Sequence, residues 1–241
     1  MLKGKVILAV VPARSKSRGI PDKNMRLLGG VSLIGRAGTA LSALPFIDAR
    51  VISTDSPEYA AEGRRYGLDA PFLRPSSLST DEAGAVETVQ HALLESEKHY
   101  SKKFDIVLIV EPTSPLRLPE DIERVVHRLI DTGADSVATV SPLPSKFHPS
   151  KVLTGKDGRL GFFMEDGNRI RARQQLRGDL YWRNGVCYAL TRACLMERHA
   201  VITDNTIGDV ITRPVVNVDD PIELEWAELL LRGGDSRLAV K

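Results

Sequence analysis

Apolar runs and amphipathic segments alternate along the first 140 residues of the chain. Three runs rich in β-branched residues, at 6–11, 49–54 and 104–110, have the character of strands buried on both faces. Shorter runs predict further strands at 70–73, 136–140, 185–190 and 215–218. The alternation predicts an α/β fold, with a mostly parallel sheet and helices on both faces.

The segments between these runs repeat their apolar residues at spacings of three and four, which predicts helices with one buried face. A capping side chain or an early proline marks where each helix begins. The predicted starts are Ser32, for a helix to about Leu44, Pro57, for a helix to about Gly67, a capping box at 79–82, Pro119 and Pro221.

The pattern changes after Ser141. Residues 142–184 contain three prolines near their start, a Lys156-Asp157-Gly158 turn, a concentration of basic residues and little helical periodicity. A segment of this size is too small for a stable core of its own. We therefore expect one domain over residues 1–241 with an inserted, β-rich arm at about 142–184.

Composition narrows the class of protein. The 241 residues carry a net charge of +2, which is too balanced for a nucleic-acid coat. Cys187 and Cys194 lack a metal-binding pattern and suit buried free thiols in a reducing compartment. No apolar stretch reaches the 18 residues of a membrane helix, and the start does not resemble a signal peptide. We expect a cytoplasmic protein that binds neither membrane nor nucleic acid.

A basic loop follows the first strand. Arg14, Lys16, Arg18 and Lys23 lie within ten positions, separated by serines and a glycine. In open α/β sheets, ligands bind at the carboxyl ends of the strands, and the amides of a tight loop can hold an anion. The loop therefore suits a polyphosphate, although a solvated basic loop would show the same charge density.

The spacing within the loop points to one family. Residues 13–24, ARSKSRGIPDKN, resemble the signature A-R-x-x-S-K/R-G-[IL]-x-x-K-N of the CMP-sialic acid synthetase (acylneuraminate cytidylyltransferase) family. The resemblance extends from Val6 to about Leu230. It implies a Rossmann-like nucleotide-diphospho-sugar transferase fold. It also implies transfer of CMP from CTP to the anomeric hydroxyl of an acidic nine-carbon 2-keto-3-deoxy sugar, with release of pyrophosphate.

The resemblance assigns roles to residues around the nucleotide. Arg14 and Lys23 are implied to hold the triphosphate and, together with Asp219, to be catalytic, because cations that follow the developing phosphate charge stabilise the transition state. Arg74, in an Arg-Pro pair, is implied to lie beside the cytosine. The full set of expected nucleotide-binding residues is Ala13, Arg14, Ser17, Gly19, Lys23, Asn24, Arg74 and Ser79.

A magnesium site is implied where the family ends its last core strand in Asp-x-Asp. This chain has Asn217 and Asp219 there, so one carboxylate is missing. Mg²⁺ needs only one or two carboxylates when phosphates and water complete its coordination, so Asp219 can suffice with Asn217 as a neutral ligand. Asp220, directly before Pro221, is predicted to be a helix N-cap instead.

A second departure concerns the sugar. Residues 111–115 read EPTSP where the family has QPTSP, and a carboxylate can only accept hydrogen bonds whereas an amide can also donate them. We therefore hypothesise a sugar other than N-acetylneuraminate. The resemblance further implies a homodimer in which each arm reaches over the sugar pocket of the other subunit. The expected sugar-binding residues are Glu111, Thr113, Ser114, Lys151, Arg173, Asn184 and Tyr188.

Two alternatives remain open. The related synthetase for the eight-carbon acid Kdo shares the chemistry, and a non-catalytic nucleotide-binding module could retain the fold. The non-catalytic alternative stays open because Glu111 and Asn217 replace the Gln and Asp that the family has at these positions. A dinucleotide-dependent dehydrogenase is disfavoured because no G-x-G-x-x-G follows the first strand.

Overall fold

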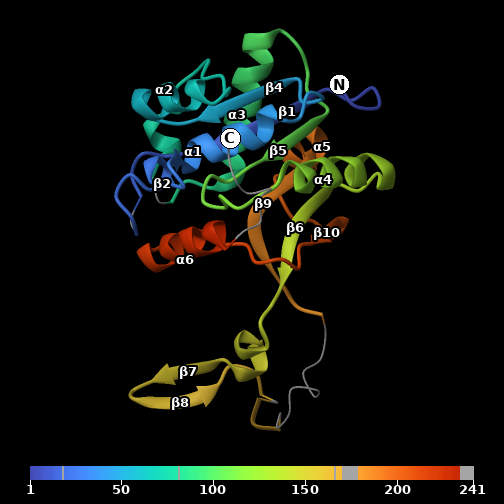
Figure 1. Ribbon diagram of the computed structural model, residues 1–241. Helices are drawn as coiled ribbons and strands as arrows, with labels where there is room; N and C mark the ends of the chain where they lie inside the picture. The colour runs from blue at the N-terminus through green and yellow to red at the C-terminus, as the bar shows by residue number, and fades with distance from the viewer. Residues whose placement is uncertain (18, 81, 166, 170–178, 234–241) are drawn as a thin grey trace.

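A six-stranded sheet forms the centre of the computed structural model, which describes residues 1–241 except 18, 81, 166, 170–178 and 234–241 (Figure 1). The strand order is β10-β6-β9-β5-β1-β4, and among these strands β9 alone runs antiparallel to its neighbours. The mostly parallel sheet is thereby confirmed. The strands are β1 (Ile7–Pro12), β4 (Ala49–Ser53), β5 (Ile106–Ile109), β6 (Ser136–Pro142), β9 (Tyr181–Thr191) and β10 (Thr206–Val210).

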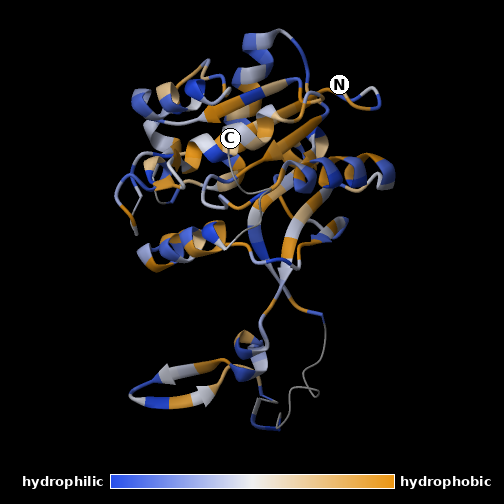
Figure 2. Cartoon of the chain, in the orientation of Figure 1, coloured by the Kyte–Doolittle hydropathy of each residue, from blue (hydrophilic) through white to orange (hydrophobic). Residues whose placement is uncertain are grey.

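Helices cover both faces of the sheet, as predicted. Alternate residues of β1 enter two different cores: Ile7 packs in the core formed with α1, α2 and α4, and Leu8 in the core formed with α3 and α5. Figure 2 shows the apolar strands lying between helices that turn polar residues outward. The helices are α1 (Leu33–Ser42), α2 (Pro57–Arg65), α3 (Ala85–Tyr100), α4 (Pro119–Thr132), α5 (Arg192–Met196) and α6 (Pro221–Arg232).

Two of the predicted helix caps are confirmed and one is wrong. The Ser32 hydroxyl accepts from the Gly35 amide at 2.9 Å, and Asp220 forms a reciprocal capping box with Glu223. The predicted box at 79–82 does not cap α3, which begins at Ala85 after Gly84 and has no side-chain cap. A short 3-10 turn, η2 (Ser76–Leu78), directly precedes the predicted box.

The predicted strands at 70–73 and 215–218 are wrong: in both segments, which the structure describes in full, the chain is irregular. Val216 and Val218 are buried because they pack in a third apolar cluster with α6, and the Val218 amide donates to the Thr113 carbonyl at 2.7 Å. The strand at the sheet edge is β10, whose sequence TIGDV has too little apolar character to have been predicted.

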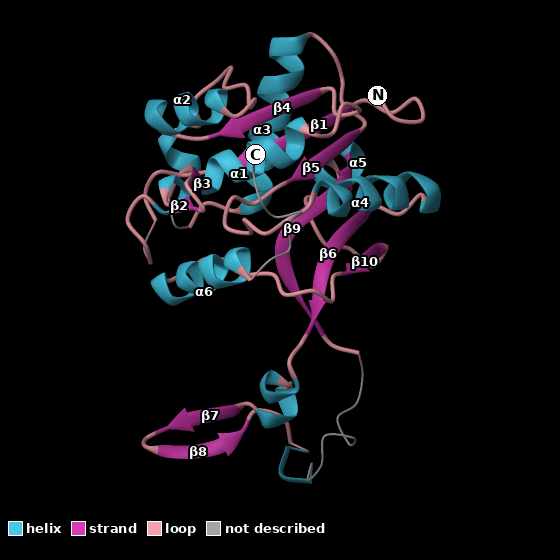
Figure 3. Cartoon of the chain, viewed as in Figure 1, coloured by secondary structure: helices cyan, strands magenta, loops and turns pink. Residues whose placement is uncertain are grey.

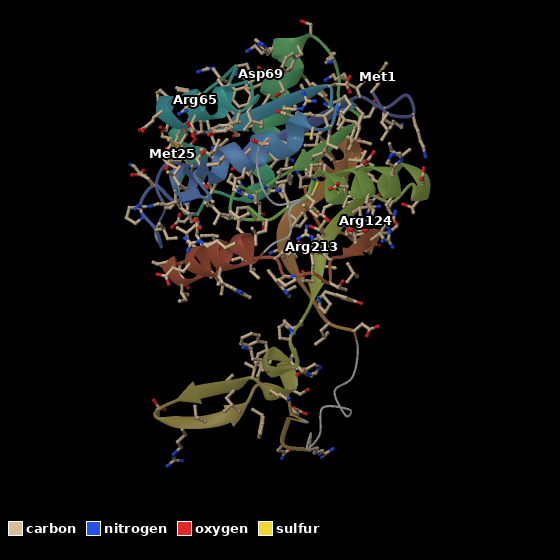
Figure 4. All side chains as sticks on the ribbon, viewed as in Figure 1. Met1, Met25, Arg65, Asp69, Arg124 and Arg213 are labelled. Atoms are coloured by element: carbon tan, nitrogen blue, oxygen red, sulfur yellow. The ribbon has the colours of Figure 1, made fainter. Side chains whose placement is uncertain are left out.

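Ion pairs fasten this edge to α4. Arg124 donates to Asp209 of β10 at 2.9 Å, and Arg213, from the segment after β10, donates to Asp121 at the start of α4 (Figure 4). Both carboxylates are almost fully buried. These pairs fix the route by which the chain returns toward α6 and the carboxyl edge of the sheet.

The arm leaves the sheet between β6 and β9 (Figure 3). Its hairpin consists of β7 (Leu153–Lys156) and β8 (Arg159–Phe162), joined at Asp157 and Gly158, which both have positive φ angles. Every residue of the two strands is exposed. Residues 181–184, expected in the arm, belong to β9. The remaining short elements are η1 (Lys23–Met25), β2 (Leu27–Leu28), β3 (Val31–Ser32), η3 (Ser145–Phe147), η4 (Pro149–Lys151) and η5 (Gly167–Arg169).

Two further expectations concern bulk properties. Cys187 and Cys194 are buried free thiols, as predicted, and burial raises the pKa of Cys187 to about 12. Within the described part of the chain, no helix combines the length and apolar character that a membrane crossing requires.

Candidate active site

A cavity of about 490 Å³ opens at the carboxyl ends of β1 and β5. Pro12 and Ile109, the last residues of these strands, form part of its floor, and the first turns of α3 form part of its wall. This is the edge at which open α/β sheets bind ligands. The lining residues are Pro12, Arg14, Ser17, Gly19, Lys23, Asn24, Arg74, Leu78, Thr80, Ala83, Ala85, Thr88, Val89, Ile109, Glu111, Pro112, Thr113 and Asp219.

The basic loop closes against Asp219. The Lys23 ammonium donates to the Asp219 carboxylate at 2.8 Å, although the two residues are 196 positions apart. Gly19 meets the backbone of the same residue, since a Cβ atom at Gly19 would lie 2.2 Å from the Asp219 carbonyl oxygen. The cation after the first strand and the carboxylate before the last helix therefore share one wall of the cavity.

Several hydrogen bonds hold the basic loop in shape. The Asn24 amide donates to the Arg14 carbonyl at 3.2 Å, and the Ser15 amide and hydroxyl both donate to Asp55, at 2.9 and 2.8 Å. Tyr59 supports the loop from α2 by donating to the Ser15 carbonyl. Burial alone would raise the pKa of Asp55, but the bonds from Ser15 bring it below its ordinary value. The sequence did not reveal these roles for Asp55 and Tyr59.

Arg74 lines the cavity with only 6% of its surface exposed. Its guanidinium donates to the carbonyls of Ser53, at 2.9 Å, and Leu78, at 3.4 Å, while its Nε has no partner among the described residues. Burial lowers the pKa of Arg74 below its ordinary value, and nearby Arg14 lowers it further. Arg74 thus supports the wall of the cavity through its bonds to two backbone carbonyls.

Glu111 follows β5 and faces the same cavity. Its carboxylate lies against Gly185, where a Cβ atom would come within 2.3 Å of Oε2, and Gly185 has a φ of +70°. Among the described residues, no donor forms a hydrogen bond to this carboxylate. Burial raises the pKa of Glu111, and the positive charges of Arg117 and Arg183 only partly offset that effect. A ligand that donates a hydrogen bond would give the Glu111 carboxylate a partner.

Arg117 holds the loop after Glu111 in place through hydrogen bonds to backbone carbonyls. This guanidinium is 4% exposed and donates to the carbonyls of Val186, at 3.1 Å, and Glu111. Burial lowers the pKa of Arg117 to about 10. Ser114 adds a bond to the Asn184 carbonyl. Arg117 is therefore a positioning residue, whose role the motif spacing did not show.

The cavity collects nine of the predicted site residues: Arg14, Ser17, Gly19, Lys23, Asn24, Arg74, Glu111, Thr113 and Asp219. Five others make structural contacts behind the described cavity wall: Ala13, Ser79, Ser114, Asn184 and Tyr188. Lys151 lies on the arm and Arg173 falls outside the described residues. The cavity therefore brings together most of the residues expected around the nucleotide, but of those expected around the sugar its described lining includes only Glu111 and Thr113.

The predicted metal ligands differ in their surroundings. Asp219 faces the cavity, whereas Asn217 lies outside its described lining and its Oδ1 is buried with no hydrogen-bond partner among the described residues. Across those residues, no cluster of three or more His, Cys, Asp or Glu side chains could hold a metal by itself. One cavity carboxylate fits an ion such as Mg²⁺ that arrives with phosphates and water, which need few protein ligands.

Comparison with known proteins places the chain. A sequence profile of the cytidylyltransferases matches residues 8–156. The chain belongs to the cytidylyltransferase family. It is 30% identical over 221 residues to the CMP-N,N'-diacetyllegionaminic acid synthase of Legionella pneumophila, covering 92% of this chain and 93% of that protein. It is 33% identical over 224 residues to the N-acylneuraminate cytidylyltransferase of Escherichia coli O18:K1:H7, covering 92% and 51%.

A solved structure supports the fold of this cytidylyltransferase. A CMP:2-keto-3-deoxy-manno-octonic acid synthetase complexed with CTP superposes with a TM-score of 0.68 at 16% identity, covering 95% of this chain and 99% of that one. The Rossmann-like nucleotidyltransferase fold and membership of the CMP-sialic acid synthetase-like group are thereby confirmed, and the protein is a nucleotidyltransferase.

Proposed function

We propose that this chain transfers CMP from CTP to the anomeric hydroxyl of a nine-carbon 2-keto-3-deoxy acid and releases pyrophosphate. The observation that carries the proposal is the closure of the basic loop on Asp219 at one edge of the cavity. The relatives named for legionaminic, pseudaminic and N-acylneuraminic acids support a nine-carbon acceptor.

The chain's own residues suit an in-line displacement. The sugar hydroxyl gives up its proton to water as its oxygen forms a bond to the α-phosphorus. The bond from the α-phosphorus to the oxygen that bridges to the β-phosphate breaks, so that pyrophosphate leaves with the electron pair. Arg14 and Lys23 lie on the cavity wall where they can offset charge on the transferred and leaving phosphates. Ser17, Gly19 and Asn24 shape the loop beside them.

We propose Asp219 as the protein ligand of Mg²⁺, with Asn217 as a weaker candidate because its oxygen lies behind the wall. When bound, Mg²⁺ would neutralise phosphate charge and lower the pKa of the attacking hydroxyl. Lys23 already contacts the Asp219 carboxylate at 2.8 Å, so it can change partners from Asp219 to a phosphate oxygen when the ion and CTP enter.

The sugar side is proposed to include Glu111 and Thr113 from this chain and the basic arm of a second copy, with Lys151 and Arg173 facing the sugar carboxylate. The Glu111 carboxylate can accept a bond from an amide or hydroxyl of the sugar. We propose that the favoured sugar differs from N-acetylneuraminate. The free buried thiols suit a reducing compartment, so we place the reaction in the cytoplasm.

The test is pyrophosphate release by the purified protein with CTP, Mg²⁺ and a panel of acidic sugars. The expected result is release with a nine-carbon acid, and loss of release when a chelator removes Mg²⁺. Release with Kdo alone would favour the eight-carbon alternative. Release with none of the sugars, despite CTP binding, would favour a non-catalytic nucleotide-binding module. A preference for N-acetylneuraminate over every related acid would contradict the role given to Glu111.

A further inference from the structure

Two carboxylates enter the cavity from segments that are bonded to each other. Of the described residues that line the cavity, only Glu111 and Asp219 are acidic. Glu111 lies on the loop after β5, and Asp219 directly precedes the cap of α6. The Val218 amide donates to the Thr113 carbonyl at 2.7 Å. This backbone bond joins the residue before Asp219 to the residue two positions after Glu111, so the two loops carry their carboxylates into the same space.

The two carboxylates differ in their partners. Asp219 accepts a hydrogen bond from the Lys23 ammonium at 2.8 Å, whereas the Glu111 carboxylate accepts none from the part of the chain that the structure describes. Burial is the main reason that the pKa of Glu111 is raised, and the negative charge of Asp219 adds to it, while Arg117, Arg183 and Lys23 offset part of the effect. A cation bound by both carboxylates would replace their mutual repulsion by attraction.

The position of the Glu111 side chain is set by the fold. A Cβ atom at Gly185 would lie 2.3 Å from its Oε2, so only a glycine leaves room for the carboxylate there. The Ser114 amide and the Arg117 guanidinium both donate to the Glu111 carbonyl, which holds the backbone of the same residue. A ligand oxygen placed by its supporting contacts suits metal binding, because little order is lost when the ion arrives.

Asn217 is less suited to hold a cation. It lies outside the described lining of the cavity, and its Oδ1 is buried without a hydrogen-bond partner in the described chain. An amide oxygen is also neutral, whereas the Glu111 oxygens carry charge when ionised. The sequence agrees with this difference: relative to the motifs compared above, a carboxylate is missing at position 217 and one is present at position 111.

We propose that Glu111, in place of Asn217, is the second protein ligand of the divalent cation, with Asp219 as the first. This inference rests on the Mg²⁺ of the proposed function and goes beyond it, because the ion is then held by two loops rather than by two side chains of one segment. Mg²⁺ is commonly bound by one or two carboxylates, with phosphate and water oxygens in its other positions. One Glu111 oxygen can bind the ion while the other accepts a hydrogen bond from the sugar.

Titration with Mn²⁺ alone, followed by the electron paramagnetic resonance signal of the free ion, is the first test. It uses the full chain without CTP or sugar, so the role of Glu111 toward the sugar cannot affect the result. Glu111→Gln keeps the size of the side chain and removes its charge. We expect this variant to bind Mn²⁺ at least about tenfold more weakly than the wild type, and Asn217→Ala to bind it as the wild type does.

Glu223→Gln is the matched control for charge alone. The Glu223 carboxylate accepts from the Asp219 amide at 2.7 Å, so it is close to the first ligand, but Glu223 lies outside the described lining of the cavity. Its substitution should change Mn²⁺ affinity by less than about twofold. Equal losses in Glu223→Gln and Glu111→Gln, unchanged binding by Glu111→Gln, or a wild type that binds no Mn²⁺ would overturn the proposal.

Thermal melts with and without Mg²⁺ provide a second measurement. A ligand that binds only the folded state raises the melting temperature, so Mg²⁺ should stabilise the wild type and Asn217→Ala more than it stabilises Glu111→Gln. Melts without the ion show whether each variant is folded. An equal rise in all three proteins would contradict the role of Glu111.

Pyrophosphate release by the wild type separates this inference from the proposed function. Release with Mg²⁺ and a nine-carbon acid, together with unchanged Mn²⁺ binding by Glu111→Gln, would refute the inference and leave the proposed function standing. Mn²⁺ binding that depends on Glu111, in a wild type that neither binds CTP nor releases pyrophosphate, would support the inference and count against the proposed function alone.

Discussion

Gly19 and Asp219 approach so closely that a single methyl group could not fit between them, since a Cβ atom on Gly19 would lie 2.2 Å from the Asp219 carbonyl oxygen. The added Cβ atom would meet backbone atoms of Asp219, so no side-chain rotation could relieve the clash. The basic loop and the segment that carries Asp219 are thereby held as one unit.

Gly19→Ala should therefore push the basic loop and Asp219 apart, which together form the proposed phosphate site. We expect CTP affinity and turnover both to fall by about tenfold or more, because small misplacements of charged groups are costly in catalysis. Gly208→Ala in β10 is the control: its added Cβ would lie at an ordinary 3.4 Å from Val140. Steady-state kinetics and CTP titration measure the effect, and equal behaviour of the two variants would contradict it.

Lys23→Ala should lower kcat more than it weakens CTP binding. The ammonium is held at the cavity by Asp219 in the free protein, so its gain on binding CTP is smaller than its contribution as charge develops on the phosphates. We expect a loss of about 10²–10³ in kcat. Isothermal titration with CTP and pyrophosphate-release kinetics separate the two quantities, and unchanged turnover would remove Lys23 from the mechanism.

Glu111→Gln should make stability less dependent on pH. Because the pKa of Glu111 is raised in the folded protein, its contribution to stability is fully present below the ordinary pKa and is lost as the pH rises through the raised value. The variant keeps the shape and carries no charge, so its melting temperature should exceed that of the wild type near pH 8 and match it near pH 4. A gain of order 1 kcal/mol would correspond to about 2–4 °C.

Thermal melts from pH 4 to pH 8 provide this measurement. Glu120→Gln, at an exposed position in α4, should show no such trend. A difference between Glu111→Gln and wild type that stays constant, or that shrinks as the pH rises, would refute burial as the cause of the shift.

Arg117→Met should destabilise the protein without touching the cavity wall. It leaves the carbonyls of Val186 and Glu111 without their donor in a buried place, at a cost of about 3 kcal/mol or roughly 6–12 °C in melting temperature. Arg65→Met, whose side chain is 72% exposed, should change the melting temperature by about 1 °C or less. Equal melting temperatures for both variants would rule out the positioning role.

Sequence patterns identified the sheet and its helices because these elements are buried on a regular period. Alternate residues of β1 enter opposite cores, and the run at 6–11 therefore showed no polar interruption. The edge strand β10 was missed for the opposite reason: Asp209 there is satisfied by Arg124, a partner 85 residues away that no local pattern can show. The run at 215–218 is apolar because it packs under α6, not because it pairs in a ladder.

The difference between local patterns and contacts far apart in the sequence also explains which residues around the cavity were predicted. The spacing of cations in the basic loop is local, so Arg14 and Lys23 could be placed from the sequence alone. Asp55, Tyr59 and Arg117 act by holding backbone in place, and ordinary-looking helix and loop residues can do that. For Asn184, the motif suggested a ligand contact, whereas its side chain is used within the fold, donating to the Ser141 hydroxyl at 3.0 Å.

The root of the arm has a consequence for engineering. Pro142 of β6 and Tyr181 of β9 are register partners, and the Leu143 amide donates to the Leu180 carbonyl at 2.8 Å just beyond them. The arm is thus an insertion at the end of the antiparallel pair that β6 and β9 form. A two-residue Asn-Gly turn between positions 143 and 180 could replace everything in between, leaving a shortened body whose sheet keeps its alignment and which lacks Lys151 and Arg173.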